Sequence, residues 1–175
     1  MYIVYMSVNV LIRPERPGDI EAISAVTEMA FRTCPHGEHT EQFIIAALRR
    51  TGALTVSLVA ELDAKVAGHI AFSPVQISDG SSAWYALGPV SVVPELQGQG
   101  IGQALVNAGL DELRRLGAAG CVLVGEPGYY GRFGFRSRPE LTMDAVPQEV
   151  VLSLGFGEHS AAGKITHHEA FAARA

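Results

Sequence analysis

A glycine-rich turn is the stretch of this sequence best suited to chemistry. Residues 97–102, with the sequence QGQGIG, follow the apolar run 87–93 and precede a segment with helical periodicity. Glycines at alternate positions leave backbone N–H groups uncovered, and the N-terminus of the following helix adds partial positive charge. Such a turn binds anions, above all phosphate or pyrophosphate. The glycines alone leave open a tight strand-to-helix turn that binds nothing.

The spacing of the glycines narrows the choice of phosphate ligand. A nucleotide-binding P-loop requires a lysine after its last glycine, whereas Gln103 and Ala104 follow Gly102 here. A dinucleotide site requires GxGxxG, and this turn reads GxGxG after two earlier predicted strands. The pattern therefore disfavours both a nucleotide triphosphatase and a dinucleotide-binding oxidoreductase.

Two blocks of the sequence resemble the GNAT superfamily of acetyl-CoA-dependent N-acetyltransferases. Gln97, Gly100 and Gly102 match the superfamily's pyrophosphate motif, (Q/R)-x-x-G-x-(G/A). Residues 129–135, YYGRFGF, are similar to its FYxxxGF segment, and the two blocks occur in the right order. The resemblance covers residues 10–136, and within the superfamily residues 123–135 resemble the YhbS-like branch.

The resemblance implies a mixed α/β (α+β) fold. Its central sheet is expected to be mostly antiparallel, with one splayed parallel pair and with helices on both faces. Acetyl-CoA is the implied co-substrate, with its pyrophosphate on the glycine turn and its pantetheine along the open strand edge. An N–H near Val92 or Val93 would stabilise the oxyanion. The predicted cofactor-binding residues are Val90, Ser91, Val92, Val93, Gln97, Gly98, Gln99, Gly100, Ile101, Gly102 and Gln103.

Acetyl transfer also requires an acid for the leaving thiolate and a base for the amine. Tyr130 aligns with the superfamily's general-acid tyrosine, and an ordinary phenol titrates at about 10, close to the thiol of CoA. Tyr129 is expected only to pack. Glu126 directly follows a short predicted strand and is the candidate base, with a plain surface carboxylate as the alternative. His69 is expected to be a structural histidine whose hydrogen bonds are satisfied.

No convincing metal site is present in the sequence. Cys34, His36 and His39 have C-x-H-x-x-H spacing, but they share one loop and lack a fourth ligand in register. We therefore expect no metal. Arg132 and Arg136 are candidates for the 3′-phosphate of CoA, with simple solvation as the alternative.

Hydrophobic periodicity predicts the order of the elements around the turn. Asp19 is the expected N-cap of the first helix, and bulges or edges are expected near Gly68 and Pro74. The strand before the glycine turn and the strand after its helix should be parallel. The predicted strands are 9–13, 54–62, 66–77, 87–93, 120–125, 150–154 and 164–168, and the predicted helices are 20–31, one from about residue 40 to 50, and 100–116, with a short helix or turn at 127–133.

Length and composition set the remaining limits. The 175 residues, 48% of them hydrophobic, predict a single globular domain, 1–175. The net charge of −5 and the lack of a Lys/Arg run argue against nucleic acid and favour a cationic substrate. The apolar stretch 1–12 is too short to cross a bilayer, so no membrane partner is expected, and translation could start at Met1 or Met6. Cys34 and Cys121 suggest no disulfide framework, which fits the cytoplasm.

Together these observations predict an N-acetyltransferase in which a primary amine attacks acetyl-CoA directly in a ternary complex. The acceptor, a small molecule or a peptide, is not specified by the sequence, and neither is the choice between monomer and homodimer. Two alternatives stay open: transfer of a longer acyl chain, and a non-catalytic acyl-CoA-binding or regulatory module.

Overall fold

The structure, a computed structural model, describes residues 9–35 and 37–175. The two candidate start sites, Met1 and Met6, lie outside the described residues, as does His36. Nine strands form the sheet: β1 Leu11–Pro14, β2 Val56–Leu62, β3 Lys65–Ile77, β4 Trp84–Val92, β5 Gly120–Val124, β6 Arg136–Ser137, β7 Leu141–Thr142, β8 Val151–Gly155 and β9 Gly163–His167. The α-helices are α1 Ile20–Arg32, α2 Glu41–Arg50, α3 Ile101–Arg115 and α4 Pro127–Tyr130. Short 3₁₀ turns are η1 Pro17–Asp19, η2 Pro94–Leu96, η3 Gly131–Phe133, η4 Gln148–Val150 and η5 Glu169–Ala172.

The strand order is β1-β2-β3-β4-β5-β8-β6, with β9 beside the end of β3 and β7 beside β9. Every predicted helix and strand is present in the predicted order, which confirms the mixed α/β fold with its mostly antiparallel sheet. The two-residue strands β6 and β7 were not predicted, because two residues are too few to show an alternating pattern.

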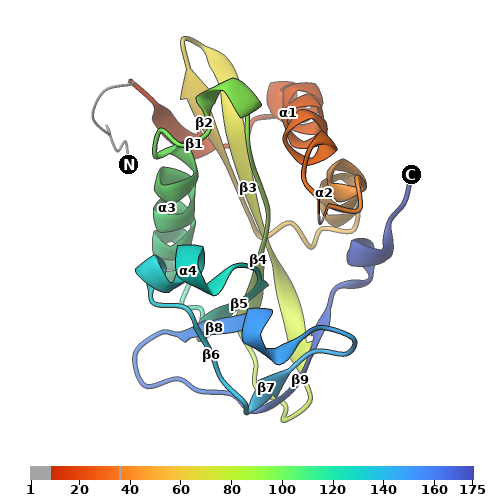
Figure 1. The fold of residues 1–175 in the computed structure, drawn as a ribbon, viewed down its shortest axis with the longest axis vertical. Helices are drawn as coiled ribbons and strands as arrows, with labels where there is room; N and C mark the ends of the chain where they lie inside the picture. Colours follow the sequence, from red (N-terminus) through yellow and green to blue (C-terminus); the bar gives the residue numbers. More distant parts are fainter. Residues whose placement is uncertain (1–8, 36) are drawn as a thin grey trace.

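Helices cover both faces of the sheet (Figure 1). On one face, Ile23 of α1 and Ile45 of α2 pack with Val59 and Ala71. On the other face, apolar residues of α3 pack against Ile70 and neighbouring strand residues. Successive strand residues point to opposite faces, so alternate residues of β3 serve the two layers. The sheet is therefore the central layer of a three-layer structure.

The parallel pair β4 and β5 separates part of the way along. Pairing runs from Trp84 with Gly120 to Ala86 with Val122, although β4 continues to Val92 and β5 to Val124. Beyond Ala86 the pairing of β4 with β3 shifts register, which bends the strand. Among the described residues, the last part of β4 thus has an unpaired edge on the β5 side, and the predicted splay is confirmed.

The expected bulge near Gly68 is confirmed, since the partners of Ala60 and Glu61 are Gly68 and Val66, which leaves Ala67 as the extra residue of β3. Pro74, in contrast, stays in register opposite Tyr85. The pairing of β3 with β2 ends at Phe72 and that with β9 begins at Val75, so Pro74 has a strand partner on one side alone among the described residues, which is the predicted edge position.

The prediction that Asp19 is the N-cap residue of α1 is confirmed. Asp19 occupies the N-cap position, but its side chain makes no capping hydrogen bond to that helix. Its buried carboxylate instead accepts hydrogen bonds from Arg13, at 2.7 and 3.0 Å, and from the backbone N–H of Arg16. The hydrogen bond from Arg13 is the main reason that the pKa of Asp19 lies below its usual value. The carboxylate that the sequence pattern assigned to the helix start is instead hydrogen-bonded to the buried guanidinium of Arg13.

No helix within residues 9–35 and 37–175 combines the length and the apolar character needed to cross a membrane.

Candidate active site

The glycine turn forms an open cradle at the start of α3. Gly98 and Gly100 adopt φ angles of +74° and +87°, in the left-handed region where glycine is favoured. No side chain caps α3, and its first backbone hydrogen bond runs from Ala104 N–H to the carbonyl of Gly100. The N–H groups of the first helical turn, Ile101 to Gln103, are therefore directed out of the helix end. They form the uncovered helix start that the glycine spacing predicts.

A cavity of about 290 Å³ lies at this cradle. The side-chain amide of Gln97 donates a 3.0 Å hydrogen bond to the carbonyl of Val92, which ties the turn to the end of β4. Seven of the predicted cofactor-binding residues line this cavity together: Val92, Gln97, Gly98, Gly100, Ile101, Gly102 and Gln103. The other lining residues are Leu96, Tyr129 and Arg132.

The other predicted cofactor residues lie outside this cavity. Val90 is half-buried and packs against the core, and Gln99 is exposed, with its amide directed back to the carbonyl of Glu95. Ser91 is buried, and its hydroxyl lies 3.3 Å from that of Thr27 on α1. The contribution of Val90 and Ser91 to an added pantetheine strand would come from their backbone.

The free edge of β4 distinguishes between the two predicted oxyanion donors. The N–H of Val93 donates to the carbonyl of Ala67 at 2.8 Å, so Val93 is already paired and its assignment as the donor is wrong. Successive amides of a strand point to opposite sides, and the N–H of Val92 therefore points to the unpaired edge. Val92 is the remaining candidate.

Tyr130 lies beside Gly125, directly after the end of β5. Its ring packs edge-on against Tyr129 and Phe135, at centroid distances of 4.9 and 6.2 Å, and it occupies the space left by Gly125. Burial, with smaller contributions from Tyr129 and Cys121, raises the pKa of the phenol to about 12. We expected the pKa of the phenol to be about 10 and so to match the pKa of the CoA thiol. That expectation is wrong for this site. The phenol keeps its proton throughout the physiological pH range.

Sequence reasoning missed the position of Tyr129 beside the cradle, whereas Arg132 was already a candidate for a phosphate of CoA. The hydroxyl of Tyr129 lies 3.2 Å from where a Cβ on Gly102 would stand, so it borders the cradle. The guanidinium of Arg132 stacks on that ring, 4.6 Å from its centroid, and its Nε donates to the carbonyl of Tyr129 at 2.9 Å. Arg132 is the cation in the wall of the cavity. The available signal was their spacing in the 129–135 block, which places both on one turn of α4–η3.

Glu126 has a structural role that the sequence did not reveal. It is exposed, stands at the N-cap of α4, and accepts a 2.8 Å hydrogen bond from the N–H of Gly128. Arg136 likewise holds the loop, donating to the carbonyls of Gly131 and Phe135. The base role of Glu126 stays a prediction.

His69 is only half satisfied, contrary to expectation. Its side chain is fully buried, and Nε2 lies 2.8 Å from the hydroxyl of Ser57. Nδ1 has no hydrogen-bond partner among the described residues. Across those residues no group of three metal-ligating side chains comes together, and His36 lies outside them.

Comparisons with known proteins agree with this geometry. Residues 22–135 match the model of the acetyltransferase (GNAT) family. This chain belongs to that family and is a GNAT N-acetyltransferase, as the two sequence blocks predict.

Among its relatives, the N-acetyltransferase YhbS of Escherichia coli strain K12 is 38% identical over 126 residues, which cover 71% of this chain and 72% of YhbS. The resemblance to the YhbS-like branch is thereby confirmed. The crystal structure of YhbS from Escherichia coli in complex with CoA superimposes with a TM-score of 0.85 at 30% identity, covering 98% of this chain and 96% of that one. A GNAT family acetyltransferase from Brucella melitensis in complex with acetyl-CoA gives a TM-score of 0.84 at 47% identity, covering 94% of this chain and 99% of that one.

Proposed function

We propose that this protein transfers the acetyl group of acetyl-CoA to a primary amine, by direct attack of the amine within a ternary complex. The observation that carries the proposal is the uncapped start of α3, opening beside the unpaired edge of β4. The two similar proteins in complex with CoA and acetyl-CoA support the choice of co-substrate.

Each part of the site has a distinct task in this reaction. The first-turn amides of α3 bind the pyrophosphate, and Arg132 adds a positive charge at the same cavity. The open edge of β4 pairs with the pantetheine amides as an added strand would. The N–H of Val92 donates to the oxyanion as the amine attacks the thioester.

Collapse of the tetrahedral intermediate expels the thiolate of CoA, and Tyr130 supplies its proton. The phenol is suited to this step because it is protonated at neutral pH, its pKa having been raised to about 12 by burial. The amine must lose a proton in the same turnover, and Glu126 is the base that the sequence suggests. Direct transfer is favoured because Cys121 is fully buried, which excludes it as an acyl-carrying nucleophile.

Both free thiols, Cys34 and Cys121, fit a reducing cytoplasm, where we place the reaction. The net charge of −5 favours a cationic acceptor, whether a small molecule or a peptide.

A thiol-release assay tests the proposal. The purified protein is incubated with acetyl-CoA and a panel of primary amines, and liberated CoA is measured. Tyr130→Phe should lower kcat by about 100-fold while the Kd for acetyl-CoA stays unchanged. A non-catalytic acyl-CoA-binding module would release no CoA with any amine, and a preference for longer chains would appear when butyryl-CoA or octanoyl-CoA replaces acetyl-CoA.

A further inference from the structure

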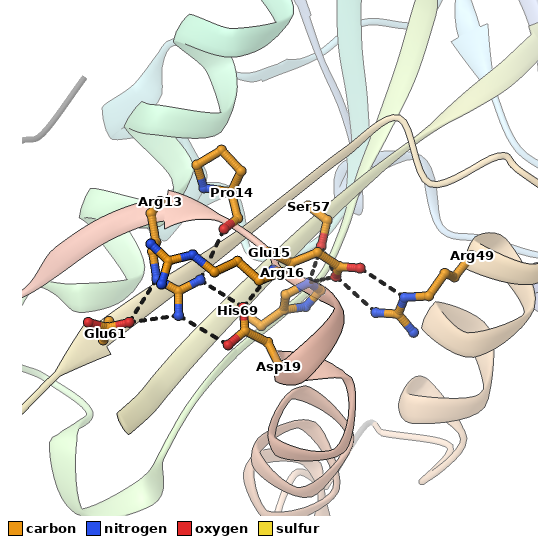
Figure 2. A network of polar contacts seen from close by, with 9 residues as sticks. All are labelled: Arg13, Pro14, Glu15, Arg16, Asp19, Arg49, Ser57, Glu61 and His69. Carbon is orange, nitrogen blue, oxygen red and sulfur yellow. Dashed lines mark hydrogen bonds and ion pairs between the residues drawn. The ribbon is translucent and has the colours of Figure 1, made fainter. Parts of the chain in front are cut away.

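A row of polar side chains crosses the otherwise apolar interface beneath α1. His69 of β3 lies directly opposite Ser91 of β4, and both are buried. On the other side of His69, Ser57 of β2 and Glu15 continue the row (Figure 2). Buried polar groups normally have all their hydrogen bonds made, so the pattern of donors and acceptors along this row is informative.

The positions of the hydrogens follow from the partners. The hydroxyl of Ser57 contacts both a carboxylate oxygen of Glu15 and Nε2 of His69. An ionised carboxylate only accepts, so the single hydroxyl hydrogen of Ser57 is donated to Glu15. Ser57 must then accept from an Nε2–H of His69. In the neutral ring this leaves Nδ1 as a bare acceptor, and no donor reaches it in the described structure.

Ser91 lies at the end of a second series of hydrogen bonds, and its oxygen also lacks a donor among the described residues. The hydroxyl of Thr27 donates to the carbonyl of Ile23 at 2.7 Å. Its contact with Ser91 at 3.3 Å must therefore use the hydrogen of Ser91. The oxygen of Ser91 is left with acceptor capacity, on the residue paired with His69. Nδ1 of His69 is therefore a buried acceptor without a donor in the described structure, and the strand residue opposite it carries a hydroxyl oxygen that can still accept.

The row runs from the strand beside the proposed transfer site toward the surface. Ser91 immediately precedes Val92, whose N–H faces the unpaired edge of β4. At the other end, Glu15, Ser57 and Arg49 line a separate cavity of about 350 Å³. The side chain of Glu15 is 18% exposed, so this carboxylate exchanges protons with solvent.

We propose that His69, in place of the candidate base Glu126, is a proton-relay residue, which takes the proton lost by the attacking amine through a water molecule held by Nδ1 and the Ser91 oxygen. The inference rests on the proposed function and deepens it by naming the path of the proton. The amine N–H passes its proton to the water, and the water passes one to Nδ1. The Nε2 proton moves to Ser57, and the Ser57 proton moves to Glu15. After the product leaves, the reverse shifts return a proton from Glu15 through Ser57 to Nε2 and release the Nδ1 proton to water, which restores the Nε2–H tautomer. No electrons are exchanged.

The environment of His69 favours the neutral ring, which suits a residue that passes a proton on without staying protonated. Glu15, Arg49 and Asp19 are the charged groups that act on the ring, and burial outweighs them, lowering the pKa of His69 to about 4. The ring is thus neutral at pH 7. Burial raises the pKa of Glu15, but hydrogen bonds from Arg49 and Ser57 more than offset this, so its pKa lies below the usual value and it releases a proton readily.

Two amines separate a relay from a structural role. n-Butylamine is an ammonium ion at neutral pH, whereas hydroxylamine is largely unprotonated and needs little help to lose its proton. With acetyl-CoA and n-butylamine, His69→Gln should lower kcat by about 100-fold, and Ser57→Ala should lower it by about 10-fold or more. With hydroxylamine both losses should be much smaller. Equal losses with the two amines, or full kcat in His69→Gln, would overturn the proposal.

Ser73→Ala is the matched control. Ser73 is a fully buried serine on the same face of β3, and its hydroxyl has no partner in the described structure and lies outside the row. Its kcat should equal that of the wild type. All three variants should bind acetyl-CoA with wild-type Kd in calorimetry, which shows that they fold.

A spectroscopic readout does not depend on turnover. In protein labelled with ¹⁵N-histidine and saturated with acetyl-CoA, the ring nitrogens of His69 should report the Nε2–H tautomer. An Nδ1–H tautomer would overturn the relay whatever the activity. Acetyl-CoA binding without thiol release by the wild type would instead overturn the proposed function, so the two failures are distinguishable.

Discussion

The ring of Tyr130 lies against the backbone of Gly125, so closely that a Cβ on residue 125 would stand 2.6 Å from the ring. The phenol ring can lie here because residue 125, at the end of β5, is a glycine and has no side chain. Gly125→Ala should push the ring aside, destabilise the fold by about 1–3 kcal/mol and lower kcat. Thermal unfolding and the thiol-release assay measure the two effects. Unchanged kcat in this variant would mean that the position of the phenol does not matter for turnover.

The second prediction concerns the cradle. A Cβ on Gly102 would stand 3.2 Å from the Tyr129 hydroxyl, inside the wall of the cavity. Gly102→Val should therefore fill the anion site and raise the Kd for acetyl-CoA by about 10-fold or more, a loss of about 1.4 kcal/mol. Gly18→Val is the control, because a Cβ there meets nothing within 4 Å. Equal affinities of the two variants in calorimetry would contradict the placement of the pyrophosphate.

The third prediction concerns the charge of Arg132. Its guanidinium lies in the cavity wall, stacked on Tyr129. Arg132→Gln should weaken acetyl-CoA binding by about 10-fold at low salt, because a charged hydrogen bond to phosphate is lost. The difference from the wild type should shrink as salt is added. Arg32→Gln removes an exposed arginine paired with Glu28 on α1 and should leave the Kd unchanged. If the two arginine variants behave alike, Arg132 does not meet the phosphates.

The fourth prediction links His69 to the pH dependence of stability. The pKa of His69 is about 4 in the fold, while the unfolded chain titrates at the ordinary value of 6.5. Between these values the unfolded chain binds more protons. The free energy of unfolding should therefore fall as the pH drops from 6.5 toward 4, by at most about 1.4 kcal/mol per pH unit.

Urea unfolding from pH 7 to 4.5 measures this dependence. His69→Gln should show a flatter curve in that window. The lowered pKa values of Glu15 and Asp19 act below their ordinary values of 4.5 and 3.8, so their contribution is lost only at lower pH. Parallel curves for the wild type and His69→Gln would show that His69 does not titrate as described.

The sequence predicted those features that depend on local pattern. Alternating glycines defined the cradle from Gln97 to Gln103, and periodicity located the helices and strands. The splay of β4 from β5 was implied by family resemblance, and the structure confirms it.

Features that depend on tertiary contacts were beyond the sequence. The half-satisfied state of His69 depends on Ser57 of β2 and on Glu15, which directly follows β1. The sequence pattern predicts that the side chain of Asp19 caps a helix, but its carboxylate accepts a hydrogen bond from the buried Arg13 instead. Val93 continues the β3–β4 ladder past Val92 by donating to the carbonyl of Ala67, and this removed one of the two oxyanion candidates. In each case a contact between two different elements decided the outcome.

Isothermal titration with acetyl-CoA tests the central claim most directly, with CoA and NADH titrated alongside. The cradle formed by the start of α3 and the open edge of β4 predicts micromolar binding of acetyl-CoA and CoA and none of NADH. Absence of binding by both acetyl-CoA and CoA would contradict the cofactor assignment, and the roles proposed for Tyr130 and His69 would fall with it.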